Sequence, residues 1–336
     1  MTRNQRVIIV VGLVITVVFL GIAFYKLQPE AVWGYIRQAN PLLLAFAACW
    51  YFTGVAVISL RWQYLMRSTK FVPARKLFQL VCVTYMGNNI YPLRSGEVLR
   101  VILLQHDEAV PLASGGTIAI TERIFDGIVM LTFVIISLAL LNVASSDLRN
   151  VALITAPVFV LALLIFFVLA LKPEILRRLI TLISRILPGK LGDLAHKLGE
   201  DVIAGLEGLR TPADLAGTVI FSYLSWMLEA STYWIVSFAF NLHVPYPAML
   251  LVVGVVNLAG LIPASPGGFG VYEFFGVLSL GAVGIGQAQA VAFILVNHLV
   301  IWLPVTVAGL VVLIRRGLGI GAITHVEQLE KEVAAS

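Results

Sequence analysis

The chain has 336 residues, of which 60% are hydrophobic and only 12% charged, and its mean hydropathy is +0.96. Soluble domains carry about 25% charged residues. The composition therefore argues against a disordered chain or a soluble enzyme and predicts a polytopic membrane protein. The net charge is +5. We attribute this excess to cationic loops at the cytoplasmic face and expect no nucleic-acid partner.

Apolar runs of membrane-spanning length recur along the chain. The first, 7–24, follows Arg3 and Arg6 and imitates a signal peptide, but it exceeds the ~7–15 residues of a signal-peptide core and predicts an uncleaved span. The other predicted spans are 42–60, 118–141, 150–171, 215–242 and, at the end of the apolar stretch 274–314, residues 287–314. Each approaches or exceeds the ~20 residues that a helix needs to cross a bilayer.

The basic residues predict the orientation of these spans. Most of the 23 lysines and arginines fall in four groups, namely Arg3 and Arg6; Arg61, Arg67, Lys70, Arg75 and Lys76; Lys172–Arg210; and Arg315, Arg316 and Lys331. Cytoplasmic loops carry such an excess of positive charge. We therefore expect a multi-pass protein of the cell (inner) membrane with both termini in the cytoplasm.

This orientation leaves two segments that must enter and leave the membrane on the same side. Residues 77–93 end in a polar stretch before Glu97, and residues 247–283 are interrupted by the Pro- and Gly-rich segment 262–270. Pro and Gly break helices, and broken backbone at membrane depth must line protein or a wet cavity. The predicted fold is all-α, with about six full spans and two re-entrant helical hairpins from opposite faces, an arrangement typical of inverted halves.

We expect a single transmembrane domain over residues 1–336. Its only sizeable polar segment, 172–214, is smaller than a typical catalytic domain. Apolar residues recur there at steps of three and four, as in an amphipathic helix, at Leu191, Leu194, Leu198, Val202, Leu206 and Leu209. Together with residues 174–187 they predict two helices along the inner membrane surface. A solvated connector packed on neighbouring spans is the alternative.

Ionisable groups at membrane depth point to a polar site, because each costs ~2.5–3.5 kcal/mol at mid-bilayer. Three clusters qualify: Arg94, Glu97 and Arg100; Glu122, Arg123 and Asp126; and Glu273, which follows the Pro/Gly-rich segment. Glu122 and Asp126 share one helix face and repel each other unless a cation lies between them. We expect Arg94 or Arg100 to supply this cation.

These residues suit an anionic ligand. Arg94 and Arg123 offer planar guanidinium groups to a phosphate, and backbone N–H groups of the Gly267–Gly268 turn would add an anion cradle. The predicted substrate-binding residues are Arg94, Glu97, Glu122, Arg123, Asp126, Ser265, Gly267, Gly268 and Glu273. Alternatively, the charged residues pair only with one another and lock the two hairpins together.

Other polar and aromatic residues in the spans carry weaker signals. Glu229 and His298 each stand alone in a predicted span, and a polar helix contact and a functional role both remain open. The tryptophans Trp33, Trp50, Trp62 and Trp302 are interpreted as interface anchors or packing. We expect no metal and no cofactor.

Three motifs in this order resemble one known family. They are Asn89-x-x-Pro92-x-Arg94-x-Gly96-Glu97, Glu122-Arg123-x-x-Asp126 and Pro263-x-Ser265-Pro266-Gly267-Gly268-x-Gly270-x-x-Glu273. They resemble the lysylphosphatidylglycerol synthase transmembrane-domain family, which includes the flippase half of the multiple peptide resistance factor. The resemblance implies broken helices and movement of lipids between leaflets. In the full synthase a soluble aminoacyl-transferring domain follows, whereas this sequence ends about twenty residues after Arg315-Arg316, so we expect no aminoacyl transfer.

The favoured function is therefore a lipid transporter whose partner is a phospholipid or a polyprenyl-phosphate lipid, with a homodimer left open. The sequence holds no Gly-x-x-x-x-Gly-Lys-Ser/Thr nucleotide loop, so an ion gradient, partner proteins or downhill scrambling would drive it. One alternative is a polyprenyl-phosphate-dependent membrane glycosyltransferase or other lipid-modifying enzyme, with Glu97 or Asp126 as general base or metal ligand. Another alternative is an ion or small-solute channel.

Overall fold

The computed structural model describes residues 3–25, 28–91, 95–141, 173–186, 211–262 and 265–317, together with Gly189, Gly192, Asp193 and His196. Within these ranges it is all-helical and contains no strand. The α-helices are α1 (Arg3–Ala23), α2 (Pro29–Gln38), α3 (Pro41–Met66), α4 (Ala74–Ile90), α5 (Gly96–Glu108), α6 (Leu112–Leu140), α8 (Pro173–Ile186), α10 (Pro212–Ala239), α11 (Tyr246–Ala259), α12 (Val271–Ala282) and α13 (Gln287–Arg315), with the short 3₁₀-helix η2 (Pro266–Gly268).

The long helices confirm the all-α membrane fold. Among the described residues, α3, α6 and α13 are long and apolar enough to cross a membrane. The predicted spans 7–24 and 215–242 lie within α1 and largely within α10. The predicted span 150–171 lies outside the described residues, and so does the predicted amphipathic helix around 191–209 except for Gly192, Asp193 and His196. The number of full spans therefore stays a prediction.

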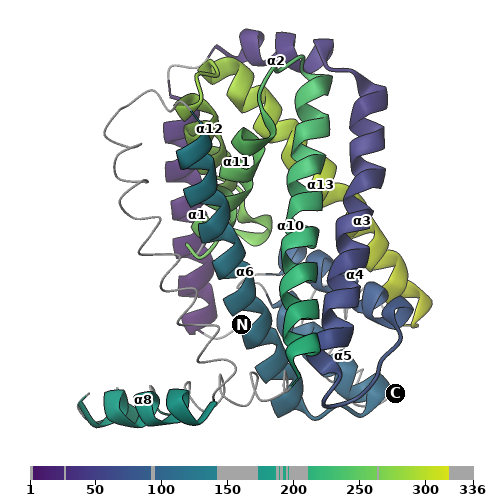
Figure 1. Cartoon of the computed structure of the whole chain (residues 1–336). Helices are drawn as coiled ribbons and strands as arrows, with labels where there is room; N and C mark the ends of the chain where they lie inside the picture. Colours follow the sequence, from purple (N-terminus) through teal and green to yellow (C-terminus); the bar gives the residue numbers. More distant parts are fainter. Residues whose placement is uncertain are drawn as a thin grey trace.

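Local sequence signals start the two helices at the centre of the bundle. The Asn40 side chain caps α3 by accepting hydrogen bonds from the N–H groups of Leu42 and Leu43, at 3.0 and 3.3 Å. Thr211 caps α10 in the same way, through the N–H of Asp214 at 3.0 Å. Proline in the first turn of each helix has no N–H to leave unpaired. Helices α3 and α10 then pack side by side along their length (Figure 1).

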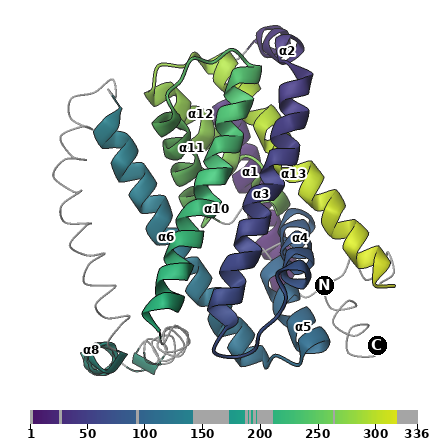
Figure 2. The same ribbon diagram turned by 45° about the vertical axis from the view of Figure 1, so that its right-hand side comes forward.

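The structure contains both predicted hairpins. Helices α4 and α5 fold back on each other between α3 and α6, and α11 and α12 do so between α10 and α13. Figures 1 and 2 show the first hairpin in the lower half of the molecule and the second in the upper half. The turn of the first is close because Gly96 has no side chain: a Cβ there would lie 2.0 Å from the carbonyl oxygen of Thr84.

The two hairpins belong to halves of opposite direction. Each half runs through a long helix, a hairpin and a second long helix, and α3 descends in Figure 1 whereas α10 ascends. The packing repeats as well, because α4 packs on α13 and α11 packs on α6. This exchange of partners agrees with the predicted inverted halves, and it brings the two hairpin tips together near mid-height.

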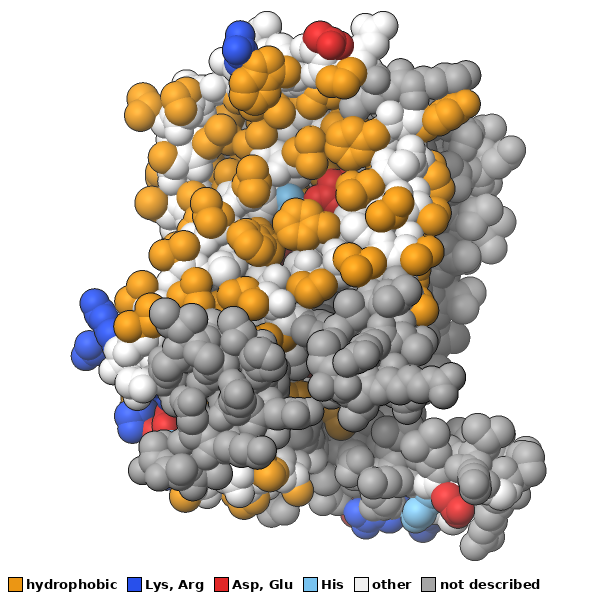
Figure 3. All heavy atoms as spheres, turned by 180° about the vertical axis from the view of Figure 1, so that it is seen from behind, with side chains coloured by type: hydrophobic (Ala, Val, Ile, Leu, Met, Phe, Trp, Pro, Cys, Tyr) orange, Lys and Arg blue, Asp and Glu red, His pale blue; other side chains and the backbone are white. Residues whose placement is uncertain are grey.

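Apolar side chains cover the outside of this bundle and also form its core. Large exposed side chains such as Val17, Leu42 and Leu303 lie on the outer surface, where a bilayer would contact them (Figure 3). Helix α8 lies across the lower end (Figure 1), with Arg177 and Arg178 exposed. This placement agrees with the predicted helix along a membrane surface.

Candidate functional site

A cavity of about 360 Å³ lies where the hairpin tips meet. Its wall combines both halves of the molecule, and polar side chains in it include Tyr85 and Asn88 of α4, Arg123 of α6, Glu229 of α10, and His298 and Trp302 of α13. The broken segment of the second hairpin contributes Ser265, Gly267 and Gly268. Leu261, 79% exposed, also lines the cavity, so the wall reaches the apolar outer surface.

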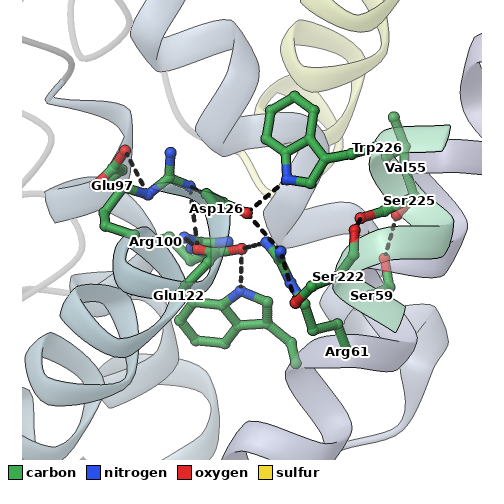
Figure 4. Close-up of polar contacts among 12 residues, drawn as sticks. Val55, Ser59, Arg61, Glu97, Arg100, Glu122, Asp126, Ser222, Ser225 and Trp226 are labelled. Atoms are coloured by element: carbon green, nitrogen blue, oxygen red, sulfur yellow. Dashed lines mark hydrogen bonds and ion pairs between the residues drawn. The ribbon is translucent and has the colours of Figure 1, made fainter. Parts of the chain in front are cut away.

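One side of the cavity is a buried cluster of arginines and carboxylates (Figure 4). Arg61 of α3 lies between two carboxylates of α6, donating to Glu122 and to Oδ1 of Asp126, the latter at 2.6 Å. Arg100 of α5 donates to the other oxygen of Glu122 at 2.5 Å. Indole N–H groups complete the shell, from Trp62 to Glu122 at 2.8 Å and from Trp226 to Asp126 at 2.7 Å.

Arg123 differs from the other two arginines in this cluster. Arg100 and Arg123 both line the cavity, but the side chains of Arg61 and Arg100 are 1% and 2% exposed, whereas that of Arg123 is 42% exposed. Its contacts are longer: Nη2 lies 3.2 Å from Asp126 and 3.4 Å from Glu122, and Nε lies 3.6 Å from Glu97. Arg123 is therefore the arginine of this cluster whose donors can turn to a ligand.

A cation lies between Glu122 and Asp126, as their spacing predicts, and it comes from Arg61, which was not among the candidates. Arg61 bridges the pair, Arg100 contacts Glu122 alone, and Arg94 lies outside the described residues. Arg61 was not predicted as a site residue, because the apolar run ends at residue 60 and the arginine was assigned to a cytoplasmic loop. Helix α3 instead continues to Met66 and carries Arg61 into the protein. Trp62, interpreted as an interface anchor or a packing residue, is fully buried and donates to Glu122.

A second polar cluster holds the broken segment of the α11–α12 hairpin. Glu273 Oε1 lies 2.6 Å from Nδ1 of His298, and its Oε2 accepts the N–H of Gly270 at 2.5 Å. His298 Nε2 lies 3.1 Å from the carbonyl oxygen of Gly267. Glu273 thus caps α12 and holds His298. His298 thus makes a polar contact between helices, one of the two interpretations that the sequence left open.

The expected anion cradle at Gly267–Gly268 is partly used by the protein itself. The N–H of Gly268 donates to the carbonyl oxygen of Ser265 at 2.9 Å. The N–H of Ser265 donates to the Thr16 hydroxyl of α1 at 3.1 Å, and this hydroxyl donates to the carbonyl of Phe269 at 2.9 Å. The segment is therefore tied down by α1, and in this form its amides offer a ligand fewer donors than predicted.

Fold and site together define an all-α membrane protein with a charged cavity between two broken hairpins. Residues 9–309 match the family described as the lysylphosphatidylglycerol synthase TM region, so the chain belongs to this family, which is linked to lipids by its name. This confirms the resemblance carried by the three motifs.

Archaeal relatives share most of the chain. It is 25% identical over 328 residues to "Glycosyltransferase AglD" of Haloferax volcanii, covering 88% of this chain and 52% of that protein. The chain thus spans about half the length of AglD. It is 24% identical over 298 residues to a "UPF0104 membrane protein" of Methanothermobacter thermautotrophicus, covering 84% and 85% of the two chains. It is 22% identical over 338 residues to "UPF0104 membrane protein PH1989" of Pyrococcus horikoshii, covering 94% and 98%.

Proposed function

We propose that the protein moves a phosphate-bearing lipid between the leaflets of the membrane, with the head group in the cavity and the tails in the bilayer. The observation that carries this proposal is the position of Arg123, whose exposed guanidinium lines a cavity that also reaches the apolar surface at Leu261. Figure 3 shows acidic and histidine side chains at the bottom of an opening in an otherwise apolar face. A lipid with one charged end fits such a surface.

The cavity suits a head group in size and chemistry. Its volume of about 360 Å³ lies near the lower end of the ~300–1,000 Å³ range of ligand pockets. A guanidinium binds phosphate through two parallel N–H donors. Because Arg61 and Arg100 hold Glu122 and Asp126 firmly, Arg123 can leave these carboxylates without stranding them. Arg123 can therefore exchange its contacts with Glu97, Glu122 and Asp126 for contacts with a ligand.

The inverted hairpins supply a route to both sides. In transporters with inverted repeats, the binding site lies near the midplane and the halves rock around it. Here the cavity lies between the tips of α4–α5 and α11–α12, which approach from opposite ends. Opening at one hairpin or the other would expose the same Arg123 to either side of the membrane.

The name of AglD raises a polyprenyl phosphate as the lipid and glycosyl transfer as a second function. We favour transport, because Asp126, one predicted general base, already accepts hydrogen bonds from Arg61 and Trp226 and lies beside Arg123. These three contacts engage the carboxylate with donors of the protein itself. A lipid phosphate is common to transport and to glycosyl transfer, so both a phospholipid and a polyprenyl phosphate are tested as substrates.

We further propose that the end bearing α8 faces the cytoplasm of the cell. Helix α1 begins and α13 ends in the same half of Figure 1 as α8. Exposed basic residues of the described chain gather at this end, namely Arg67, Lys70, Arg75, Lys76, Arg177, Arg178 and Arg315. This distribution follows the positive-inside rule.

Lipid translocation in liposomes tests the function. The probes are a short-chain phosphatidylglycerol and a short-chain polyprenyl phosphate, each labelled on its chain and recovered from the outer leaflet with albumin. We expect the wild type to move at least one of them and Arg123→Gln to lose most of this activity. Arg67→Gln, in an arginine that lies outside the cavity wall, should move lipid as the wild type does. Equal rates for Arg123→Gln and wild type, or no translocation by the wild type, would reject the proposal.

A further inference from the structure

Glu229 differs from every other buried carboxylate around the cavity. It is 7% exposed and lines the cavity from α10. Glu122 and Asp126 are paired with arginines, and Glu273 with His298. Among the residues that the structure describes, Glu229 has no such partner, and its side chain hydrogen-bonds to Asn257 of α11. The cavity therefore contains one carboxylate that no positive group of the described chain balances.

The surroundings of Glu229 suit a proton better than a fixed cation. The ionisable groups that face it or share its cavity are Glu122, Arg123 and Asp126 of α6, Arg100 of α5, Tyr51 of α3, Tyr85 of α4, Tyr91 after α4, Tyr233 of α10, Tyr272 of α12 and His298 of α13. A tyrosine hydroxyl or an asparagine amide can donate to a carboxylate or accept from a carboxylic acid. Asn257, which hydrogen-bonds to Glu229, can therefore serve both forms of the carboxyl group. Within the described residues, no group of three or more His, Cys, Asp or Glu is placed to hold a metal ion.

Hydrogen bonds connect the hydroxyl groups of two of these tyrosines, Tyr233 and Tyr272. Asn297 donates to the Tyr272 hydroxyl at 2.8 Å, which donates to the Tyr233 hydroxyl at 2.8 Å. Tyr272 in turn stacks on His298, with ring centroids 4.1 Å apart. Such groups link the wall near Glu229 to the broken segment of the α11–α12 hairpin.

We infer that Glu229 is the proton-binding site that couples movement of the lipid to a proton gradient, an inference that rests on the proposed function. A phosphate that binds Arg123 brings negative charge into the small cavity that Glu229 already shares. One proton on the Glu229 carboxylate removes this repulsion, so the head group and the proton bind together. By linkage, each ligand then raises the affinity for the other by the same factor. The proton taken up on one side leaves with the lipid on the other.

The transport test compares liposomes with and without an imposed pH gradient, using the chain-labelled phosphatidylglycerol and the albumin assay. We expect wild-type translocation to be several-fold faster when the leaflet of departure faces the acidic side, and a protonophore to remove the difference. Glu229→Gln, a permanently uncharged side chain, should give the same rate with and without the gradient. Glu30→Gln, in an exposed glutamate of α2, is the matched control and should respond as the wild type does.

Infrared spectroscopy gives a readout that needs no transport. In wild-type protein in liposomes we expect a carboxylic-acid C=O band that disappears as the pH rises and is absent from Glu229→Gln. Glu229→Asp keeps a titratable group, so it should restore both the band and the gradient response if Glu229→Gln fails to fold.

The outcomes separate the two proposals. A wild type that moves no lipid rejects the proposed function. A wild type that moves lipid equally with and without the gradient, identical infrared titrations of wild type and Glu229→Gln, or a gradient-sensitive Glu229→Gln overturns the proton site alone. So does a Glu229→Gln defect that is confined to lipids with an amino head group and does not depend on pH, because the carboxylate would then bind ammonium.

Discussion

Arg61 lies in α3 and Arg67 directly follows this helix, six positions further on, yet their surroundings differ completely. Arg61 is buried between Glu122 and Asp126. The Arg67 side chain is 56% exposed and lies 3.1 Å from Asp214. Water already solvates an exposed pair, so its net contribution is small. A buried pair is different, because removing one partner leaves the other charges without solvent or counter-ion.

Replacing each arginine by Met measures this contrast. Arg61→Met should lower the free energy of unfolding by about 3–5 kcal/mol, because both carboxylates lose their bridging cation. Arg67→Met should change it by about 1 kcal/mol or less. Thermal unfolding in detergent micelles provides the comparison. Similar losses in the two variants would show that the buried cluster adds little to stability.

The sequence predicted part of this cluster. Glu122 and Asp126, four residues apart in a helix, required a cation, and the structure contains one. Its identity could not be derived, because hydropathy ends a span at its first charge, whereas a helix continues when that charge is paired inside. The pairing of Glu273 with His298 could not be predicted from the sequence either. Its geometry depends on how the broken segment turns, which residue spacing alone does not determine.

At the level of elements, the α11–α12 hairpin depends on a backbone conformation that only glycine adopts easily. Gly270 precedes α12 with φ of +87° and ψ of −58°. A Cβ on it would also lie 2.6 Å from the carbonyl oxygen of Thr16 in α1. The N–H of the same Gly270 donates to Glu273, which caps α12. The turn, the cap and the contact with α1 therefore form one unit.

Gly270→Ala should disrupt this unit. A strained residue of this kind costs about 1–3 kcal/mol, before the clash with α1 is counted. Gly281→Ala is the control on the same helix, because nothing lies within 4 Å of a Cβ there. It should change stability by about 1 kcal/mol at most, since alanine favours helices over glycine. Denaturation in detergent compares the two, and an undiminished stability of Gly270→Ala would contradict the argument.

For the whole molecule, the positions of basic residues predicted more than hydropathy did. By apolar content alone, residues 77–93 and 247–283 resemble membrane spans. Placing Arg61–Lys76, the basic segment 172–210 and Arg315–Arg316 on one side turned both into hairpins. The inverted relation of the halves was predicted from the two opposed hairpins, because the sequence holds no repeat strong enough to prove it. The packing of α4 on α13 and of α11 on α6 repeats, while the side chains that make it differ.

The orientation of the molecule gives the last prediction. Gln38 at the end of α2 and Ser68 after α3 are both exposed, at opposite ends of the bundle. In a Cys49→Ala background, which removes the exposed native thiol, Gln38→Cys should react with a membrane-impermeant maleimide added to intact cells. Ser68→Cys should react only after permeabilisation, because the basic end faces the cytoplasm. The buried thiol of Cys82 should remain unlabelled in both. Labelling of Ser68→Cys in intact cells would contradict the proposed orientation. The α4–α5 hairpin would then enter the membrane from the outer side.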